Sequence, residues 1–393
     1  MKLGELIEIK HGYAFSGEHI VEDDNGIVLV TPGNFRIGGG FKEEKCKFFD
    51  GEIPADYVLK EGDFIVTMTD LSKTIDTLGY SALVPKSKRI YLHNQRIGLV
   101  TFKSDECDRG YIYWLMRTRE YQRSIANTST GATVHHTSPK KIYDYDLEVP
   151  PLPIQHRIAN ILSRYDSLIE NYQKQIKLLE EAAQRLFKEW FVDLRFPGHE
   201  NTNIIDGVPE GWEKKRLIDL VDVQYGYAFD GKLFNSSGEG MPILRIRNIP
   251  DGITSDYTTE EAQDCYIVHN GDIVVGMDGI FHINSWSGGD AYLVQRACSF
   301  RPKEECMKGF IFQAIQEPIK FFEKTLVGAT VAHLGKKHID SIELCIPKNF
   351  ELYKPFSKFY NQRQGLLSQI RLLTEARDRL LPKLMSGEIN VES

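Results

Sequence analysis

The sequence has no long uninterrupted run of apolar residues. Its 393 residues contain no stretch of about 18 apolar residues, the length that a bilayer-spanning helix needs. Near the start of the chain, Glu5 and Glu8 stand where a secretion signal needs an apolar core. We therefore expect no membrane span and no export, and we predict a cytoplasmic protein.

Clustered cysteines and an excess of positive charge are also missing. The six cysteines are scattered, without a Cys-x-x-Cys pair or a Cys/His spacing typical of zinc, which favours reduced thiols over disulfides or a metal site. The formal net charge is −7. This charge excludes a protein coated in positive charge, but it allows a nucleic-acid binder whose basic groups gather on one face.

The motifs of common enzymes are absent as well. The only Pro-Pro pair follows Val149, so the Asn/Asp-Pro-Pro-aromatic motif of a methyltransferase is missing. Gly335-Lys336-Lys337 lacks the first glycine and the hydroxyl of a P-loop. Two Glu-x-Lys triplets, at 8–10 and 43–45, have no evident carboxylate partner for a metal nuclease, and no Gly-x-Ser-x-Gly occurs. We predict no catalytic residues, no metal and no cofactor in this chain.

A long helix is the most regular feature that is present. After Pro150-Pro151-Leu152-Pro153, a stretch without Gly or Pro carries apolar residues at alternating steps of three and four. This seam has one four-residue stutter, between Tyr172 and Ile176. It comprises Ile154, Ile158, Ile161, Tyr165, Leu168, Tyr172, Ile176, Leu179, Ala183, Leu186 and Trp190. A helix of roughly 55 Å with one apolar stripe needs a partner helix.

The rest of the chain contains two copies of one plan. The first copy has Gly-Tyr-Ala-Phe at 12–15, Gly-Asp at 62–63, Gln-Arg at 95–96 and Gly-Ala-Thr-Val at 131–134. The second copy has the same landmarks in the same order at 226–229, 271–272, 295–296 and 328–331. An ordered set of this kind indicates a duplicated domain whose loops have changed in length.

Each copy is predicted to be a mixed α/β (α+β) domain with short strands. Expected strands include 27–30, 64–66 and 273–275, and expected helices include 3–9, 111–125 and 308–324. A second seam from about Lys354 to Leu384, with polar Arg363 at one seam position, predicts the partner helix. We predict two similar domains at 1–149 and 197–347, separated by antiparallel coiled-coil helices at 150–196 and 348–393 with pseudo-two-fold symmetry.

Polar and basic residues recur at matching places in the two copies. Arg and Gln suit guanine and adenine edges, and Lys suits phosphates. The predicted DNA-binding residues are Lys86, Lys88, Gln95, Arg96, Thr133, His136, Lys140 and Lys141 in the first copy, and Gln295, Arg296, Thr330, His333, Lys336 and Lys337 in the second. Two domains on a rod of ~50 Å suit DNA sites one to one and a half turns of ~34 Å apart. This separation predicts two short sequences with an unread spacer between them. Segments 70–73 and 279–282 differ, which predicts an asymmetric target.

The pattern resembles the DNA specificity subunits of type I restriction–modification systems. The resemblance covers the whole chain and rests on the repeat together with three motifs: Val149-Pro150-Pro151-Leu152-Pro153-Ile154-Gln155, Val208-Pro209-Glu210-Gly211-Trp212-Glu213, and the closing run 380–389. The first copy departs from it by lacking the Pro-Glu-Gly-Trp lead-in and starting directly at Leu3.

This resemblance implies a role in sequence choice within a phage-defence enzyme. Each domain would be a target recognition domain for one half-site on double-stranded DNA, and the helices would set the spacer. The helices would also dock two methyltransferase (modification) subunits, and two restriction/translocase subunits would complete the enzyme. The modification subunits would bind S-adenosylmethionine and methylate adenine at N6, and ATP and magnesium would also be bound by partner subunits rather than by this chain.

Three other interpretations stay open at this point. A DNA-recognition adaptor of another methylation-based defence system would share the architecture. A coiled-coil scaffold for two protein partners would show no salt-dependent DNA affinity. A free-standing nuclease would cleave DNA with a metal and without partners.

Overall fold

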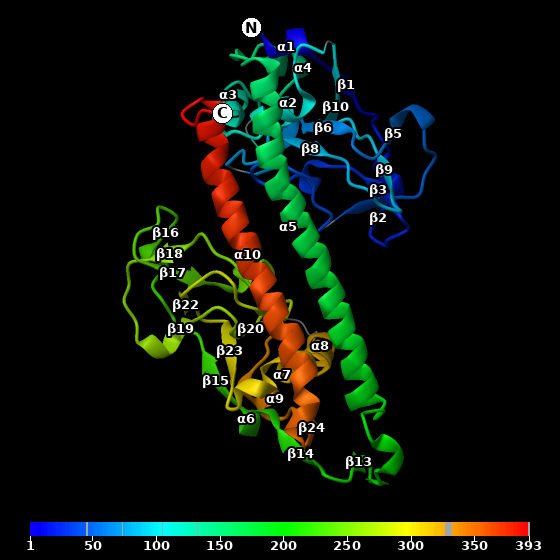
Figure 1. Ribbon diagram of the computed structural model, residues 1–393, viewed down its shortest axis with the longest axis vertical. Helices are drawn as coiled ribbons and strands as arrows, with labels where there is room; N and C mark the ends of the chain where they lie inside the picture. The colour runs from blue at the N-terminus through cyan, green and yellow to red at the C-terminus, as the bar shows by residue number, and fades with distance from the viewer. Residues whose placement is uncertain (45, 73, 104, 132, 327–331, 392–393) are drawn as a thin grey trace. The chain divides into compact units, whose positions relative to one another are not determined.

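The computed structural model describes residues 1–44, 46–72, 74–103, 105–131, 133–326 and 332–391 (Figure 1). It divides into two compact units. Unit 1 comprises Met1–Ser167 and Thr374–Ser393, and unit 2 comprises Leu168–Leu373. Each unit therefore contains one of the two predicted copies together with part of each long helix. Within the described chain, no helix is both long enough and apolar enough to cross a membrane.

Unit 1 is built around two sheets. The first is antiparallel, in the order β1 (Ile7–His11), β10 (Ile97–Phe102), β6 (Phe64–Thr67), β8 (Ser81–Leu83). The second has the order β2 (Ile20–Val21), β4 (Lys47–Phe49), β3 (Ile27–Leu29), β9 (Ile90–Leu92), β5 (Val58–Leu59). A short ladder pairs β7 (Thr69–Asp70) with β11 (His135–His136). The short helices are α1 (Leu3–Leu6), α2 (Arg109–Leu115), α3 (Arg119–Asn127) and α4 (Pro139–Tyr143).

Unit 2 has the same two sheets. The first has the order β15 (Val221–Tyr225), β23 (Ala297–Pro302), β20 (Ile273–Gly276), β21 (Ile283–Ser285). The second has the order β16 (Phe234–Asn235), β18 (Tyr257–Thr258), β17 (Met241–Leu244), β22 (Ala291–Leu293), β19 (Ile267–Val268). Two further ladders pair β12 (Ile204–Ile205) with β13 (Val208–Pro209), and β14 (Trp212–Arg216) with β24 (Glu343–Pro347). The short helices are α6 (Leu217–Leu220), α7 (Lys308–Ala314), α8 (Gln316–Thr325) and α9 (Lys336–Asp340).

The predicted duplication is confirmed by the strand order. The five-stranded sheet of each unit contains one parallel pair, β3 with β9 in unit 1 and β17 with β22 in unit 2. The remaining pairs in these sheets are antiparallel. Two unrelated domains would rarely share both this order and the place of the parallel pair, so the two units are versions of one mixed α/β fold.

Strands β6 and β20 each carry three consecutive apolar residues, at 64–66 and 273–275, because both faces of these strands are covered. In β6, Phe64 and Val66 contact the cluster beneath the helices, while Ile65 contacts the cluster between the two sheets. In β20, Ile273 and Val275 face one cluster and Val274 faces another. Alternate residues of a strand point to opposite faces, so a strand buried on both sides needs an apolar residue at each position.

The sequence interpretation was wrong about the short helices. The predicted helix 3–9 ends at Leu6, because Ile7 and Ile9 belong to β1, where they alternate with exposed residues and pair with β10. The predicted helix 111–125 is divided into α2 and α3, because the Thr118 side chain accepts a hydrogen bond from the Tyr121 amide and caps a new helix. The predicted helix 308–324 is likewise divided into α7 and α8.

Two long helices, α5 (Leu152–Phe187) and α10 (Lys354–Met385), follow the two copies. A π-helical turn, Lys188–Val192, continues α5. The predicted seam fails at Leu168, which is 44% exposed, whereas Leu162 and Ile169 are buried. An α-helix has 3.6 residues per turn, so the buried stripe drifts away from a strict heptad.

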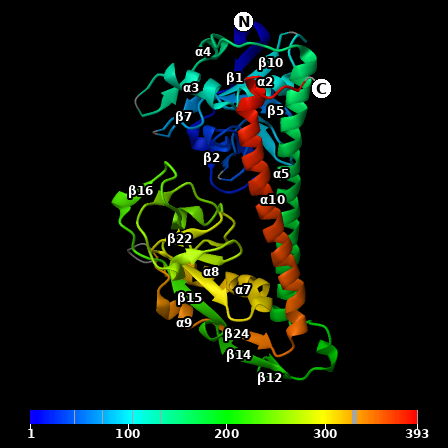
Figure 2. The same ribbon diagram turned by 60° about the vertical axis from the view of Figure 1, so that its left-hand side comes forward.

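The predicted antiparallel pairing of the long helices is confirmed inside each unit. In unit 1, Arg157 of α5 donates to the Val391 carbonyl just beyond α10, and Asp166 pairs with Arg377. In unit 2, Glu180 pairs with Arg363, and the Phe187 and Phe356 rings are in contact. Residue numbers rise along α5 as they fall along α10. Figures 1 and 2 show the first turns of α5 beside α2 and the last turns of α10, where Ile158 and Leu384 enter the core of unit 1.

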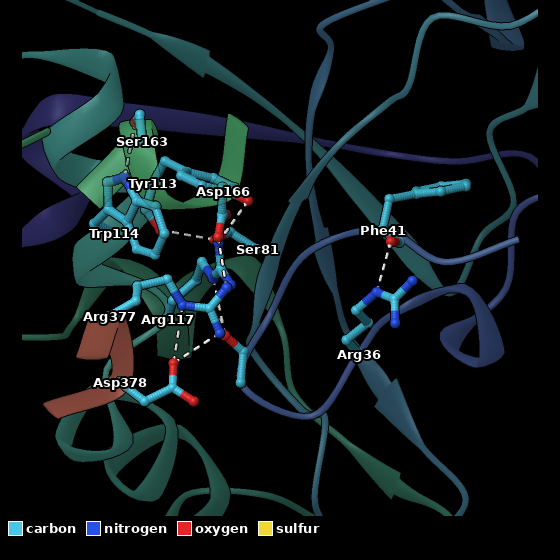
Figure 3. A network of polar contacts seen from close by, with 11 residues as sticks. Arg36, Phe41, Ser81, Tyr113, Trp114, Arg117, Ser163, Asp166, Arg377 and Asp378 are labelled. Carbon is cyan, nitrogen blue, oxygen red and sulfur yellow. Dashed lines mark hydrogen bonds and ion pairs between the residues drawn. The ribbon is translucent and has the colours of Figure 1, made fainter. Parts of the chain in front are cut away.

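A buried ion-pair network attaches the globular part of unit 1 to both helices (Figure 3). The Asp166 carboxylate accepts hydrogen bonds from Arg117 and Arg377, each at 2.5 Å. The Arg117 side chain is 4% exposed and lies over the Trp114 ring at 4.2 Å. The Trp114 indole in turn donates to Ser163 of α5. The globule therefore contacts α5 and α10 through groups that are costly to leave unpaired.

Unit 2 makes the corresponding attachment with the charges exchanged. The central group is Arg363 of α10, which is 9% exposed. Its guanidinium donates to Glu180 of α5 at 2.6 Å, to Asn284 at 2.9 Å and to the Ser285 hydroxyl. The polar seam position predicted at Arg363 is thus the point at which α5, α10 and the sheet of unit 2 meet.

Candidate nucleic-acid interface

Four segments that are distant in the sequence meet in unit 1 through backbone hydrogen bonds. The Tyr13 carbonyl accepts from the Gln95 amide at 2.9 Å, and the Arg96 carbonyl accepts from the Met68 amide at 3.0 Å. The Met68 carbonyl accepts from the Thr137 amide at 3.0 Å. These bonds place the Gln95-Arg96 turn, strand β7 and strand β11 side by side.

Unit 2 repeats these bonds one for one. The Tyr227 carbonyl accepts from the Gln295 amide at 2.8 Å, and the Arg296 carbonyl accepts from the Met277 amide at 2.8 Å. The Met277 carbonyl accepts from the Leu334 amide at 2.7 Å. We call the two surfaces recognition edge 1 and recognition edge 2. Edge 1 comprises Tyr13, Thr69, Gln95, Arg96, His136 and Lys140, and edge 2 comprises Tyr227, Asp278, Gln295, Arg296, His333 and Lys337.

The glycine of each Gly-Tyr-Ala-Phe motif is required because it lies against the backbone of a neighbouring turn. A Cβ on Gly12 would lie 2.1 Å from the Asn94 carbonyl oxygen, and a Cβ on Gly226 would lie 2.2 Å from that of Val294. The tyrosine that follows stays partly exposed, at 43% for Tyr13 and 37% for Tyr227. Each ring packs edge-on against the phenylalanine two residues later. Each edge thus carries an exposed aromatic ring beside its Gln-Arg turn.

The edges differ in the side chain that faces the histidine. In unit 1 the Thr69 hydroxyl and His136 Nδ1 are 3.1 Å apart. In unit 2 the corresponding residue is Asp278, whose Oδ1 lies 2.5 Å from His333 Nδ1 and whose Oδ2 lies 3.3 Å from Arg296 Nε. The sequence interpretation proposed Arg296 and His333 separately and missed Asp278, which follows the repeated Met277.

The predicted lysines fall into two groups. Lys140 in α4 and Lys337 in α9 are exposed and occupy equivalent places after the histidine strand. Lys141 and Lys336 have internal partners, since Lys141 donates to the Thr128 carbonyl and Lys336 pairs with Asp340 at 3.1 Å. Lys140 and Lys337 are therefore the better candidates for phosphate contacts.

The structure says less about the role of the remaining predicted residues. Lys86 and Lys88 are exposed in the loop between β8 and β9, outside edge 1, and the corresponding loop of unit 2 has no lysine. Thr133 is exposed within a hairpin closed by two hydrogen bonds between Thr130 and His136. Thr330 lies outside the described residues. Their part in DNA binding stays a prediction.

The sequence interpretation did not identify an exposed aliphatic residue that lies next to each edge. Leu71 is 59% exposed and Ile280 is 61% exposed, and each follows shortly after the residue that pairs with the histidine strand. The loop after Leu71 is held by the buried Asp70 carboxylate, which accepts from the Ser72 and Thr77 amides at 2.6 Å. Burial opposes ionisation of Asp70, but these hydrogen bonds outweigh it and lower its pKa.

The described residues contain no cluster of three or more His, Cys, Asp or Glu side chains that could hold a metal ion. Edge 1 and edge 2 instead present amide, guanidinium, imidazole and ammonium groups around an exposed ring, and edge 2 adds the Asp278 carboxylate. These groups suit hydrogen bonding and stacking rather than bond cleavage.

A comparison with protein families decides the assignment. The family model described as the type I restriction modification DNA specificity domain matches residues 1–181 and 209–371. The chain belongs to this family. The two matched ranges fall on the two copies, so each copy corresponds to one specificity domain of the family.

Two specificity subunits and one crystal structure are similar to this chain. It is 27% identical over 313 residues to the type I restriction enzyme MjaIX specificity subunit of Methanocaldococcus jannaschii, covering 72% of this chain and 69% of that protein. It is 25% identical over 194 residues to the EcoBI specificity subunit of Escherichia coli, covering 49% and 37%. The crystal structure of the type I restriction–modification S subunit from M. genitalium matches with a TM-score of 0.56 at 17% identity, covering 98% and 95%. That likeness concerns the fold alone.

Proposed function

We propose that this specificity subunit recognises an asymmetric DNA target of two half-sites, one through edge 1 and the other through edge 2. The observation that carries the proposal is the repetition of one hydrogen-bonded frame that presents Gln, Arg, His and an exposed Tyr in both units. Gln and Arg suit base edges, and Lys140 and Lys337 suit phosphates. A type I specificity subunit contributes sequence choice, and the catalytic steps belong to other subunits.

The partners follow from the same proposal. Two methyltransferase subunits would bind S-adenosylmethionine, and two restriction/translocase subunits would bind ATP and magnesium, all acting on cytoplasmic DNA. The names of the relatives, specificity subunits of type I restriction enzymes, support this assembly. A groove of about 450 Å³ between α5 and α10 in unit 2 supports docking on the helices. Its wall includes Leu178, which is 65% exposed, together with two further leucines and three glutamines.

The test is selection from a random double-stranded DNA library by the full chain purified with its modification subunit. We expect two fixed tracts separated by an unread gap, with an affinity that falls as salt rises. The double variant Gln95→Ala/Arg96→Ala should weaken the base preferences within one tract. The double variant Gln295→Ala/Arg296→Ala should weaken those within the other tract. Arg89→Ala is the control, because Arg89 already pairs with Asp24 and Glu43. A library without enriched sequences would contradict the proposal.

A further inference from the structure

One carboxylate in unit 2 contacts two exposed side chains of edge 2 at once. Asp278 contacts His333 through Oδ1 and Arg296 through Oδ2. The Asp278 side chain is 20% exposed, whereas that of Arg296 is 68% exposed and that of His333 is 59% exposed. Asp278 lies beneath two groups that extend into solvent. With both oxygens engaged, the carboxylate has little freedom to rotate away.

The backbone at Arg296 is held in an unusual conformation. Its φ is 71°, in the left-handed region that residues with a side chain rarely adopt. The Gln295 amide donates to Tyr227 and the Arg296 carbonyl accepts from Met277, so the turn is held on both sides of this residue, as it is in unit 1. Arg96, at the same place in unit 1, does not have a positive φ. A sparsely populated backbone conformation at an exposed residue is a feature of functional sites.

The contact with Asp278 determines which part of the guanidinium remains available. Nε lies 3.3 Å from a carboxylate oxygen as an ion pair, and among the described residues no hydrogen bond engages the two terminal nitrogens of Arg296. Two parallel N–H groups at the end of a guanidinium match the O6 and N7 acceptors of guanine in the major groove. A side chain already held in this orientation loses less conformational entropy on binding than a free one.

Unit 1 lacks this arrangement. Thr69, which is 3% exposed, occupies the place of Asp278, and its neutral hydroxyl contacts the histidine of edge 1. The Arg96 side chain is exposed and has no carboxylate partner among the described residues. Edge 1 therefore presents its arginine without the support that edge 2 provides.

We propose that Arg296, oriented by Asp278, is a specificity-determining residue that recognises one guanine in the half-site of unit 2. Asp278 is a positioning residue, and edge 1 has no equivalent oriented arginine. This inference rests on the proposed function. It adds which base is recognised, by which residue, and in which half-site.

The experiment measures base discrimination with the full chain purified together with its modification subunit. A random double-stranded DNA library gives, for each position of the bound target, the preference for each base. The variants are Arg296→Lys and Asp278→Asn in unit 2, with Arg96→Lys and Thr69→Val as the matched changes in unit 1. Retained recognition of the unit 1 half-site shows that each unit 2 variant is folded.

We expect Arg296→Lys to lower the preference for guanine at one position of one half-site by about 10- to 100-fold, the loss of one bidentate contact. Asp278→Asn should lower the preference at that same position by a smaller factor and leave the salt dependence unchanged. The unit 1 changes should affect the other half-site, with a smaller factor for Arg96→Lys.

Two results would overturn the inference while leaving the proposed function intact. Either Arg296→Lys keeps every base preference within about twofold, or Asp278→Asn leaves unchanged the position that Arg296→Lys alters. A wild-type complex that enriches no sequence at all would instead contradict the proposed function itself.

Discussion

The two units share a backbone and differ in the side chains attached to it. The hydrogen bonds that join the Gln-Arg turn to its neighbours are the same in both, yet Thr69 in unit 1 corresponds to Asp278 in unit 2. A buried histidine, His93, corresponds to the aliphatic Leu293. The comparison teaches that the duplicated frame fixes where the edges lie, while substitutions on the frame change what each edge can recognise.

The attachments to the long helices differ in the sign of the central charge. In unit 1 an acid on α5, Asp166, lies between two arginines. In unit 2 a base on α10, Arg363, lies among an acid and two neutral acceptors. The side chain of Asp166 is less exposed than that of Glu180, at 23% against 37%. The unit 1 network should therefore be the more costly one to break.

The largest effect is expected for Asp166→Ala. The change leaves Arg117 and Arg377 buried without their carboxylate, which costs about 3 kcal/mol or more of the free energy of unfolding. Denaturant unfolding of the full chain measures this loss. Asp378→Ala is the matched control, because Asp378 pairs with the same Arg377 but is largely exposed. Equal losses for the two variants would contradict the buried network.

A second pair of changes compares equivalent glycines. Gly12→Ala and Gly226→Ala each place a Cβ against a carbonyl oxygen of the neighbouring turn, which should cost about 1–3 kcal/mol. Each should also weaken recognition by its own edge and spare the other. Gly17→Ala and Gly231→Ala are matched controls, since a Cβ there meets nothing within 4 Å. Thermal unfolding and library selection together check both effects.

A smaller difference between the units is expected in how the free energy of unfolding changes at acidic pH. His93 is 1% exposed, and burial lowers its pKa. Below its ordinary pKa of about 6.5, the unfolded chain takes up a proton that the folded chain resists. The contribution of His93 is therefore full above about pH 6.5, and the free energy of unfolding falls as the pH drops below that value.

His93→Leu tests this expectation because it installs the residue type that unit 2 has at Leu293. Denaturant unfolding at about pH 7.5 and about pH 5.5 should show a smaller acid loss in the variant than in the wild type. The variant also loses the hydrogen bond to the Ile97 carbonyl, so only the difference between the two pH values is compared. An unchanged acid loss would exclude His93 as its source.

The smallest expected effect concerns the equivalent lysines. Lys140→Ala and Lys337→Ala should each weaken DNA binding uniformly across sequences and reduce the slope of log affinity against log salt by about 1. Lys336→Ala should change the slope less, because Lys336 already pairs with Asp340. A change in base preference for either of the first two variants would contradict a phosphate contact.

The fold could be predicted because some backbone conformations accept only certain residues, and these residues recur in both copies. Gly62 and Gly271 have φ values of +78° and +85°, and the aspartate after each accepts a backbone hydrogen bond. Such Gly-Asp turns keep their sequence when a domain is duplicated, because few residues adopt a positive φ. The repeat therefore indicated two domains of the same topology, which the strand order confirms.

Side-chain contacts between residues far apart in the chain could not be predicted from the sequence. Arg89 and Arg96 look alike in the chain, but Arg89 pairs with Asp24 and Glu43, whereas Arg96 is exposed. The partner of Arg296 lies on another strand, so Asp278 could be found only once the register was known. Leu168 was misplaced for a related reason, since a heptad count ignores the drift of a helix with 3.6 residues per turn.

The central claim is that equivalent edges recognise different half-sites, and site-specific photo-crosslinking tests it most directly. A photoreactive phenylalanine analogue would replace Tyr13 in one preparation and Tyr227 in another, because both rings are partly exposed. Each preparation would be the full chain with its modification subunit on the selected DNA. The account predicts that position 13 crosslinks to one tract and position 227 to the other. Crosslinks from both positions to the same tract, or from neither to DNA, would contradict it.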